Sequence, residues 1–475
     1  MNLIDISLIE RILSEAFDLL QKPGIRLQCP EAADLLASSG AAIDGETARI
    51  PQALVEKALA SAPPRFDLCC RDGSPAVRYG GRDVHFDPGS CAVHVLDPAS
   101  GEHRPSQSAD LLRLVQVAEG LPQFAAQSTA VVCHDALPGV PGDLYRLYLV
   151  LLHSRKPVVT GAFSAETLGA MLNLLHLDEM YTSHPDAAKH RAVFDVCPSP
   201  PLCWSEFAAR NLLDLARAGV PAEIVSMPLA GAAAPVTLVG AVVQHAAECL
   251  SGITIHQLAR PGAPVVWGGA PAIFDMRAAT TPVGAIETSM ICAAYAQVGQ
   301  HLGLPTHAYL GASDAKTVDA QAGLESGMTA LVGALAGINL ISGAGMLDFL
   351  ACQSAEKLVI DAEGIAMARR LLQGIESDYP SLAVEAFAQV GLGGDFLKLQ
   401  ETRRLFRQEQ YLPSKVIERG SVRAWQEAGS LDAFQRARRR VDELVAGYRK
   451  PELGEEVERG MKEVMERYVK RNSGA

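Results

Sequence analysis

A hydroxyl, a carboxylate and an amine lie close together in the stretch PTHAYLGASDAKTVDAQAGLESGM. They belong to Ser313, Asp314 and Lys316, which follow a short apolar run that breaks at Gly311. A helical pattern starts near Asp319, so the stretch has the order strand, polar turn and helix. Polar groups at such a strand end form the active site in barrel and doubly wound enzymes. Ser313 and Asp314 can equally well cap the helix that follows.

The elements that must position this group belong to a large, acidic chain. Its 475 residues are 48% hydrophobic and 20% charged, its formal net charge is -12 and its pI is about 5.5. This composition supports a large core, and the charge argues against nucleic acid or an anionic membrane surface as a partner. Apolar segments are interrupted by Gly, Pro or charge, and the first residues, MNLIDISLIERILSEAF, read as an acid-containing amphipathic helix. We therefore expect a cytoplasmic protein.

Cysteine and histidine spacing gives no metal-binding motif. The 10 cysteines include the adjacent pair Cys69 and Cys70, but no CxxC pair occurs. The 12 histidines form no HExxH motif, and a turn between helix and strand separates His301 from His307. We therefore expect no metal site and no disulfide framework.

The order of elements predicts an α/β protein built on a (β/α)8 TIM barrel. Residues 1–120 form a mixed N-terminal α+β region, residues 121–400 the barrel, and residues 401–475 a charged helical region. About eight alternating strand and helix units are what such a barrel needs, although an open doubly wound sheet explains a smaller number equally well. The candidate strands are 128–133, 157–161, 192–197, 223–228, 265–268, 306–310, 337–341 and 388–392.

Glycines recur at the ends of the expected strands. Besides Gly311 they include Gly343, Gly345, Gly393 and Gly394. Because glycine allows close backbone approach, the rim of the barrel can admit a large flat group as well as a small ligand. Glycines also serve turns and helix caps, and each single position fits that role as well.

Several long motifs in register resemble the trimethylamine methyltransferase superfamily. They are GVPAEIVSMPLAGAAAPVTLVGAVVQHAAE, PGAPVVWGGAPAIFDMR, YLGASDAKTVDAQAGLES and AGINLISGAGMLD, with AAIDGETARIP and RPSQSADLLRLV nearer the N-terminus. The resemblance covers essentially the whole chain. It implies a TIM-barrel methyltransferase that passes a methyl group from a methylated amine to Co(I) of a separate corrinoid protein.

Two departures from the family pattern concern the substrate. The trimethylamine-specific branch carries pyrrolysine, whereas this sequence has only standard residues, so it resembles the branch that demethylates quaternary amines such as glycine betaine, proline betaine and carnitine-like compounds. In GGDFLKLQET, near the expected eighth strand, Asp395 and Glu401 stand where the family more often has a histidine. We therefore expect these two residues to make that part of the pocket distinctive.

The resemblance also gives roles to the residues at the expected rim. Trp267 and Tyr309, with Phe274 nearby, are candidates for an aromatic cage around the cation. Asp314, Ser313 and Glu287 are the candidate catalytic residues, and Arg277 or His307 can meet a betaine carboxylate. Gly311 belongs to the substrate site. The glycines at 343, 345, 393 and 394 are expected to face the corrinoid.

The corrinoid is expected on a cognate partner and not on this chain. The segment DVHFDP resembles the corrinoid box D-x-H-x-x-G, but Pro88 takes the place of its last glycine. The expected partners are therefore the corrinoid protein, a small quaternary amine and further copies of the chain in a homo-oligomer, with no nucleic acid and no membrane.

Two other functions remain open from the sequence alone. A barrel lyase or aldolase would use Lys316 or Lys156 to form a Schiff base with a carbonyl substrate. Lys316 lies beyond its strand and Lys156 precedes Pro157 at a strand start, so neither is well placed. A non-catalytic betaine-binding protein would bind the ligand without demethylating it.

Overall fold

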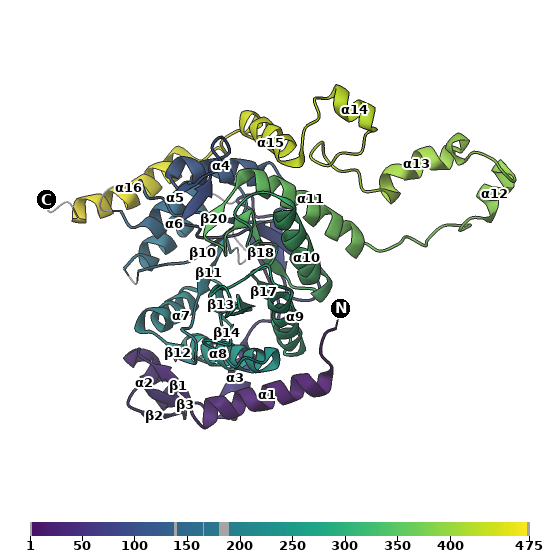
Figure 1. The fold of residues 1–475 in the computed structure, drawn as a ribbon. Helices are drawn as coiled ribbons and strands as arrows, with labels where there is room; N and C mark the ends of the chain where they lie inside the picture. The colour runs from purple at the N-terminus through teal and green to yellow at the C-terminus, as the bar shows by residue number, and fades with distance from the viewer. Residues whose placement is uncertain (1, 137–139, 165, 180–189, 473–475) are drawn as a thin grey trace.

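The computed structural model describes residues 2–136, 140–164, 166–179 and 190–472 (Figure 1). Within these residues, eight short parallel strands close into a barrel. In order around the barrel they are β6 (His85–Pro88), β9 (Gln127–Ser128), β10 (Val158–Thr160), β11 (Ala192–Val196), β13 (Ala222–Ser226), β15 (Val265–Gly269), β17 (His307–Ala308) and β18 (Leu340–Ala344). A bridge between Trp267 and Thr306 joins β15 to β17, and the amide of Ala125 donates to the Phe86 carbonyl at 2.9 Å where β6 meets β9. The predicted TIM barrel is confirmed.

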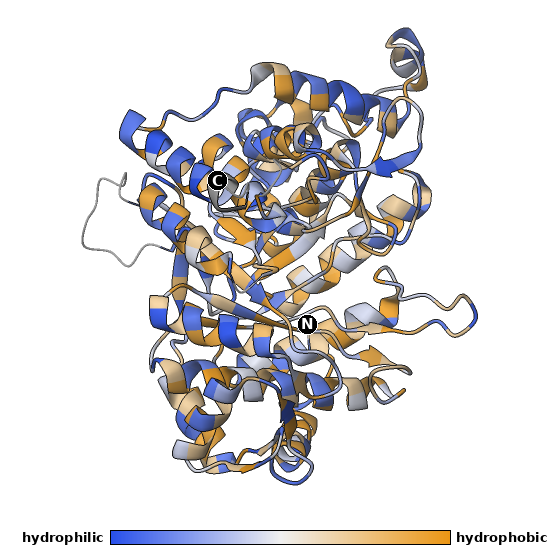
Figure 2. Cartoon of the chain, turned by 90° about the vertical axis from the view of Figure 1, so that its left-hand side faces the viewer, coloured by the Kyte–Doolittle hydropathy of each residue, from blue (hydrophilic) through white to orange (hydrophobic). Residues whose placement is uncertain are grey.

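Helices cover the outside of the barrel. They are α4 (Ser108–Glu119), α5 (Gly142–His153), α6 (Leu168–Glu179), α7 (Glu206–Ala218), α8 (Leu238–Ala259), α9 (Ile286–His301), α10 (Ala320–Ala336) and α11 (Ala355–Leu372). Helices at the surface alternate hydrophilic and hydrophobic residues along the ribbon, as expected when one face packs on the strands (Figure 2). Among the described helices, α8 alone is long and apolar enough to cross a membrane, but 83% of its apolar window is buried inside the protein. It is a core helix.

One predicted strand is wrong, and the barrel strand that replaces it comes earlier in the chain. Residues 388–392 do not form a strand, because helix α12 (Val384–Val390) occupies most of the segment and ends at Gly391. The missing strand is β6, which pairs with β18 and carries Asp87 into the barrel. The expected division at residue 120 therefore separates one barrel strand from the other seven.

The N-terminal region packs on the side and on the lower end of the barrel. Its elements are α1 (Ile6–Gln21), β1 (Ile25–Leu27), α2 (Pro30–Ser38), β2 (Ala42–Asp44), β3 (Thr47–Arg49) and α3 (Gln52–Ser61). The helices α1, α2 and α3 lie against α8, and β1 pairs with β3 and with β12 (Cys203–Trp204). This contact explains why α8 is apolar on all sides.

A hairpin closes the N-terminal end of the barrel. Its strands β4 (Phe66–Cys69) and β5 (Pro75–Tyr79) are antiparallel. Leu68, Val77 and Tyr79 are buried in one apolar cluster with barrel residues that include Val159 and Val266. Side chains of the hairpin therefore fill the bottom of the barrel as a plug.

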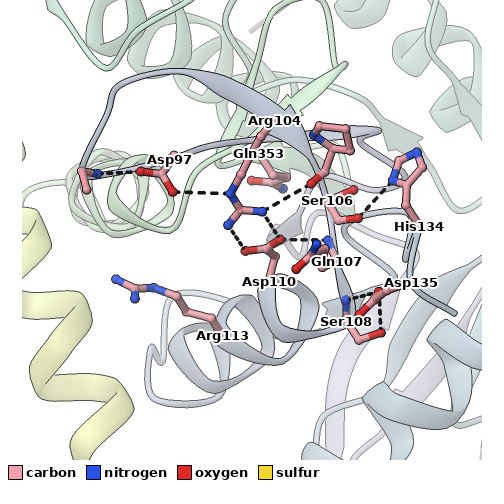
Figure 3. A network of polar contacts seen from close by, with 12 residues as sticks. Asp97, Arg104, Ser106, Gln107, Ser108, Asp110, Arg113, His134, Asp135 and Gln353 are labelled. Atoms are coloured by element: carbon pink, nitrogen blue, oxygen red, sulfur yellow. Dashed lines mark hydrogen bonds and ion pairs between the residues drawn. The ribbon is translucent and has the colours of Figure 1, made fainter.

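Further short strands build up the opposite, C-terminal rim. They are β7 (His94–Leu96), β8 (His103–Pro105), β14 (Leu229–Ala230), β16 (Ala272–Ile273), β19 (Met346–Leu347) and β20 (Cys352–Gln353). The β7–β8 hairpin is held to the start of α4 by Arg104, whose guanidinium donates to both oxygens of Asp110 at 2.7 Å (Figure 3). Asp110 also accepts from the Gln107 amide at 2.8 Å. This network fixes one wall of the rim.

The C-terminal region, residues 401–475, is helical, as predicted. It contains most of α13 (Gln400–Glu409), together with α14 (Val422–Glu427), α15 (Ala433–Gly447) and α16 (Glu455–Asn472). Helix α12 and the 3-10 helix η1 (Phe396–Lys398) come before it, in the stretch expected to belong to the barrel. Helix α15 packs on α4 and α11, and α16 packs on α5 and α6. The segment from α12 to α13 instead projects away from the barrel (Figure 1).

We predict that Leu68→Ala destabilises the whole barrel. Leu68 is fully buried in the plug, so its truncation leaves a cavity that costs about 2–5 kcal/mol. Urea unfolding measures this loss, and Arg78→Ala on the exposed face of β5 is the control expected to change little. An unchanged free energy of unfolding for Leu68→Ala would show that the hairpin does not plug the barrel.

Candidate active site

The interior of the barrel carries a layer of polar side chains above the plug. The layer consists of Asp87 from β6, Asp195 from β11, Glu223 from β13, His307 from β17 and Ser342 from β18. Strand register places Asp195 beside Glu223 and Ser342 beside Asp87. Gly268 of β15 leaves room for the layer, because a Cβ atom there would lie 2.9 Å from the Glu223 Cγ and 3.2 Å from the His307 Nδ1.

The layer is a continuous chain of polar contacts. His307 Nε2 lies 2.9 Å from the Ser342 hydroxyl, which donates to Asp87 Oδ1 at 2.5 Å. On the other side of the ring, His307 Nδ1 lies 2.7 Å from Glu223 Oε1. Tyr79 of the plug donates to Glu223 Oε2 at 3.0 Å. The plug therefore contacts the polar layer directly.

Burial sets the protonation of the layer. It lowers the pKa of His307 to about 4, which keeps the ring neutral, and raises the pKa of Glu223 to about 8. Near neutral pH His307 is therefore neutral and Glu223 is largely protonated.

Asp195 is the member of the layer that reaches toward the rim. Its Oδ2 accepts from the Tyr309 hydroxyl at 2.7 Å, and its Oδ1 has no hydrogen-bond partner among the described residues. Burial, with the nearby Glu223 carboxyl, holds the pKa of Asp195 well above its usual range. The Tyr309 hydroxyl also lies 3.4 Å from the Ser90 hydroxyl.

A cavity of about 280 Å³ lies over this layer, at the C-terminal ends of the strands. Its lining is mainly apolar and comprises Ser90, Cys91, Thr129, Gly161, Ala162, Phe163, Asp195, Val196, Cys197, Phe207, Ala208, Asn211, Val225, Met227, Ala270, Tyr309 and Leu350. Among these lining residues Asp195 is the one with a carboxyl group. A carboxyl group that can ionise beside a tyrosine ring in an apolar pocket suits a small organic cation.

A larger hollow of about 620 Å³ lies elsewhere, between residues 410–419 and α15. It is far in the fold from the ends of the barrel strands, and its lining includes no member of the polar layer. We therefore take the barrel cavity as the active site.

The structure places Ser313 and Asp314 in the rim but not in the cavity lining. Both Asp314 oxygens accept backbone amides, from Val283 at 2.8 Å and Gly284 at 2.9 Å. The Ser313 hydroxyl donates to Glu325 at 2.6 Å. Burial raises the pKa of Asp314 to about 6. In this structure the two side chains hold neighbouring loops in place.

The other predicted site residues divide between core, surface and cavity. Trp267 is fully buried on the helix side of β15, where its indole donates to the Tyr295 carbonyl at 3.0 Å. Glu287 is exposed, and the Arg277 side chain is 91% exposed and paired with Asp275. The half-buried Phe274 follows β16 outside the cavity lining. Tyr309 lines the cavity, and His307 lies in the layer beneath it.

The predicted glycines serve three different purposes. Gly311 has φ +81° and donates its amide to Thr329, and Gly345 has φ +83° and donates to Asp361 at 2.7 Å. A Cβ on Gly343 would lie 2.4 Å from the Leu310 carbonyl oxygen, so this glycine allows close strand packing. Gly393 and Gly394 lie between α12 and η1, in the projecting segment, and they do not belong to the rim of the barrel.

Asp395 and Glu401 also lie in the projecting segment. Asp395 caps η1 and Glu401 begins α13, and neither lines the barrel cavity. The expectation that they shape the substrate pocket depended on a barrel strand at 388–392. It is wrong because that segment belongs to α12 and to the projecting segment.

Sequence reasoning missed the residues that form most of the layer. Asp87, Asp195 and Glu223 are single acids inside short apolar strands, in HFDP, VFDV and AEIVS. An acid flanked by β-branched and aromatic residues has to be buried, and this is the signal that identifies it.

Comparison with known proteins shows the family of the chain and its fold. The family model described as trimethylamine methyltransferase matches residues 1–473. Trimethylamine methyltransferase from Methanosarcina barkeri is 32% identical over 98% of this chain and 95% of its own length. Glycine betaine methyltransferase from Desulfitobacterium hafniense is 28% identical over 96% and 95%. The crystal structure of Methanosarcina barkeri monomethylamine methyltransferase shares the fold, with a TM-score of 0.54 and 11% identity over 93% of this chain and 88% of that one.

We predict that Trp267→Ala acts on stability. The indole is enclosed by α8, α9 and β15, so its removal should cost about 3–5 kcal/mol in urea unfolding. Phe274→Ala, at a half-buried loop position, is the control and should cost far less. Weakened ligand binding with unchanged unfolding of Trp267→Ala would instead place the indole in the ligand site.

Proposed function

Because the chain belongs to the trimethylamine methyltransferase family and is a methyltransferase, we propose that it transfers a methyl group from a small quaternary amine to the corrinoid of a separate protein. The observation that carries the proposal is the cavity at the strand ends, with Asp195 as the one acid in its lining and Tyr309 beside it. A permanently charged ammonium group fits this combination better than a neutral or anionic ligand.

The proposed reaction needs little acid or base catalysis from the protein. In a quaternary amine the methyl carbon already carries a good leaving group, since the departing tertiary amine is neutral and needs no proton. The residues of the cavity have to hold the ammonium nitrogen and its methyl group in line with the acceptor and to exclude water. Such positioning can lower a barrier by about 7–11 kcal/mol.

The cavity fits a corrinoid presented from outside and not one held within. Its volume of about 280 Å³ suits a small amine and is too small for a corrin ring as well. Among the described residues no cluster of three or more His, Cys, Asp or Glu is placed to hold a metal ion. The docked corrinoid would supply the cobalt nucleophile.

The lining also bears on which quaternary amine is used. It contains no Lys or Arg that could neutralise a substrate carboxylate, since Arg277 lies on the surface and His307 is neutral below the cavity. A carboxylate only one carbon from the nitrogen, as in glycine betaine, would lie near Asp195. We propose a quaternary amine whose second polar group is uncharged or far enough away to reach the mouth.

The structure gives no support to a Schiff-base enzyme. The Lys156 ammonium donates to the Ala118 and Leu121 carbonyls below the barrel, where burial lowers its pKa to about 8. Lys316 lies over the Phe349 ring and 3.3 Å from Asp348 at the rim. Neither amine lines the cavity, so we do not propose this function.

We predict that a quaternary amine methylates cob(I)alamin or a cob(I)amide protein in the presence of this enzyme. Absorbance follows the loss of the Co(I) species with choline, carnitine, proline betaine, glycine betaine or trimethylamine as donor. The lining leads us to expect tighter binding of choline and carnitine than of glycine betaine. If no quaternary amine in the panel binds or reacts, the proposal fails.

We predict that Asp195→Asn weakens binding of the active cation about 10-fold or more, because it removes the acid whose ionised form attracts the cation, an attraction of about 1–4 kcal/mol at a separation of about 4 Å. Calorimetry measures the loss. Asp275→Asn is the matched control, since that carboxylate lies on the surface beside Arg277. The neutral isostere 3,3-dimethyl-1-butanol should bind both variants alike, and an equal loss for the isostere would assign Asp195 a purely structural role.

We predict that binding of the cation releases a proton. Glu223 is largely protonated below its pKa of about 8, and a cation in the cavity favours the ionised form of the acidic pair. Affinity should therefore rise with pH by up to tenfold per unit toward pH 8 and level off above it. Calorimetry in two buffers of different ionisation enthalpy counts the protons, and Glu223→Gln should lower that number, because Asp195 is then the one acid of the pair that can still release a proton. A quaternary amine has no titrating nitrogen, so a pH-independent affinity would contradict this coupling.

A further inference from the structure

The projecting segment 373–413, called the arm here, is a long loop with short helices whose two ends lie close together on α11. It leaves the end of α11, and both of its ends are tied to that helix. Arg370 donates to the Glu409 carbonyl at 2.8 Å, and the Tyr411 hydroxyl donates to the Glu363 carboxylate. The arm extends outward from the α10 and α11 side of the barrel (Figure 1).

The arm exposes many large apolar side chains. Its elements α12, η1 and α13, all of them described by the structure, contain no buried residue. The exposed side chains are Ile375, Leu382, Val384, Phe387, Leu392, Phe396, Leu397, Phe406 and Leu412, with exposed fractions of 93% for Ile375 and 103% for Leu392. A surface of this kind normally marks an interface.

The arm has no buried core of its own that could stabilise its helices. Helix α12 has 7 residues and α13 has 10, and isolated helices of this length are marginal in water. Within the described arm, the one aromatic ring contact is that of Phe387 with Phe396, whose centroids are 5.1 Å apart. Defined helices with no buried side chain require another surface to pack on.

We propose that the arm packs on the α10 and α11 face of a second copy of this chain. That face exposes Leu324 and Met328 on α10 and Met367 and Leu371 on α11. Between the two helices lies a groove of about 230 Å³, lined in part by Gly323, Gly327, Ala330 and Gly364. Apolar side chains of the arm can enter such a groove because its walls carry small residues.

The position of the arm argues against the corrinoid protein as its occupant. The arm begins where α11 ends, and this end lies at the bottom of the barrel: Arg369 donates to the carbonyl of Pro122, just before β9, at 3.2 Å. The candidate active site opens at the opposite rim. A partner that presents a group to the cavity has to approach from that rim.

Reciprocal packing of two copies also buries enough surface for a stable interface. In a two-fold arrangement each copy contributes one arm and receives one, so the apolar surface counts twice. A stable interface buries about 800 Å² on each partner, which nine large side chains and the patch they cover can supply. The inference concerns assembly and does not rest on the proposed substrate or reaction.

Light scattering after size exclusion tests the proposal on the full chain. We expect a dimer or a larger even-numbered assembly for the natural sequence and a monomer for Leu382→Asp and Leu397→Asp at the same concentration. Ile6→Asp, at an exposed position of 65% at the start of α1, is the control and should leave the assembly intact. A monomeric natural protein, or arm variants that assemble normally, would overturn the proposal.

Cross-linking separates the proposed contact from other interfaces. Leu392→Cys in the arm and Leu324→Cys on α10 are prepared as two differently tagged proteins, mixed and treated with a short bismaleimide. A cross-link that joins the two tags and is missing from each protein alone supports the arm-to-face contact. Cross-linking only between two arms, or none in the mixture, would contradict it.

Discussion

The structure depends on placing several acids inside a barrel that offers them little water. Asp87, Asp195 and Glu223 each have a pKa raised by burial, and the neutral His307 links two of them. Because folding raises the pKa of Glu223 to about 8, its contribution to stability is complete below the unfolded value and is lost as the pH rises toward 8. The acids of the layer are thus kept protonated by burial, and the strands around it have to keep their register to hold them next to one another.

That requirement explains several features of the fold. Gly268 has no side chain where the layer needs space, and Tyr79 reaches the layer from a hairpin outside the barrel sheet. The rim has a different task, which is to hold loops in place around the cavity. Asp314 accepts hydrogen bonds from two loop amides, and Arg104 pairs with Asp110, and both contacts hold loops of the rim in place. Side chains that position loops and side chains that face the ligand are therefore distinct groups.

Much of the architecture was predictable from the sequence, and the reasons for the failures are physical. Strands such as β11 and β13 stand out as apolar runs between helices, and the family motifs lie on or next to them. The segment 388–392 has the same composition but no layer to pack on, and it forms part of a helix in the arm. The segment DVHFDPG, which contains β6, reads as extended, but its place before residue 120 among other short extended pieces favours a small antiparallel N-terminal sheet over the barrel. Periodicity also cannot tell which face of β15 holds Trp267, because that depends on pairing with distant strands.

The plug at the bottom of the barrel limits how substrate and product can enter and leave the cavity. Leu68, Val77 and Tyr79 fill the N-terminal end of the barrel, so the cavity at the C-terminal ends of the strands has no passage through the barrel to that end. In an enzyme whose methyl acceptor docks over the cavity, the amine has to enter before the acceptor arrives. The demethylated product then has to wait until the acceptor leaves. In such an enzyme the shape of the cavity would impose the order of binding and release, and the lifetime of the docked complex would set an upper limit on turnover.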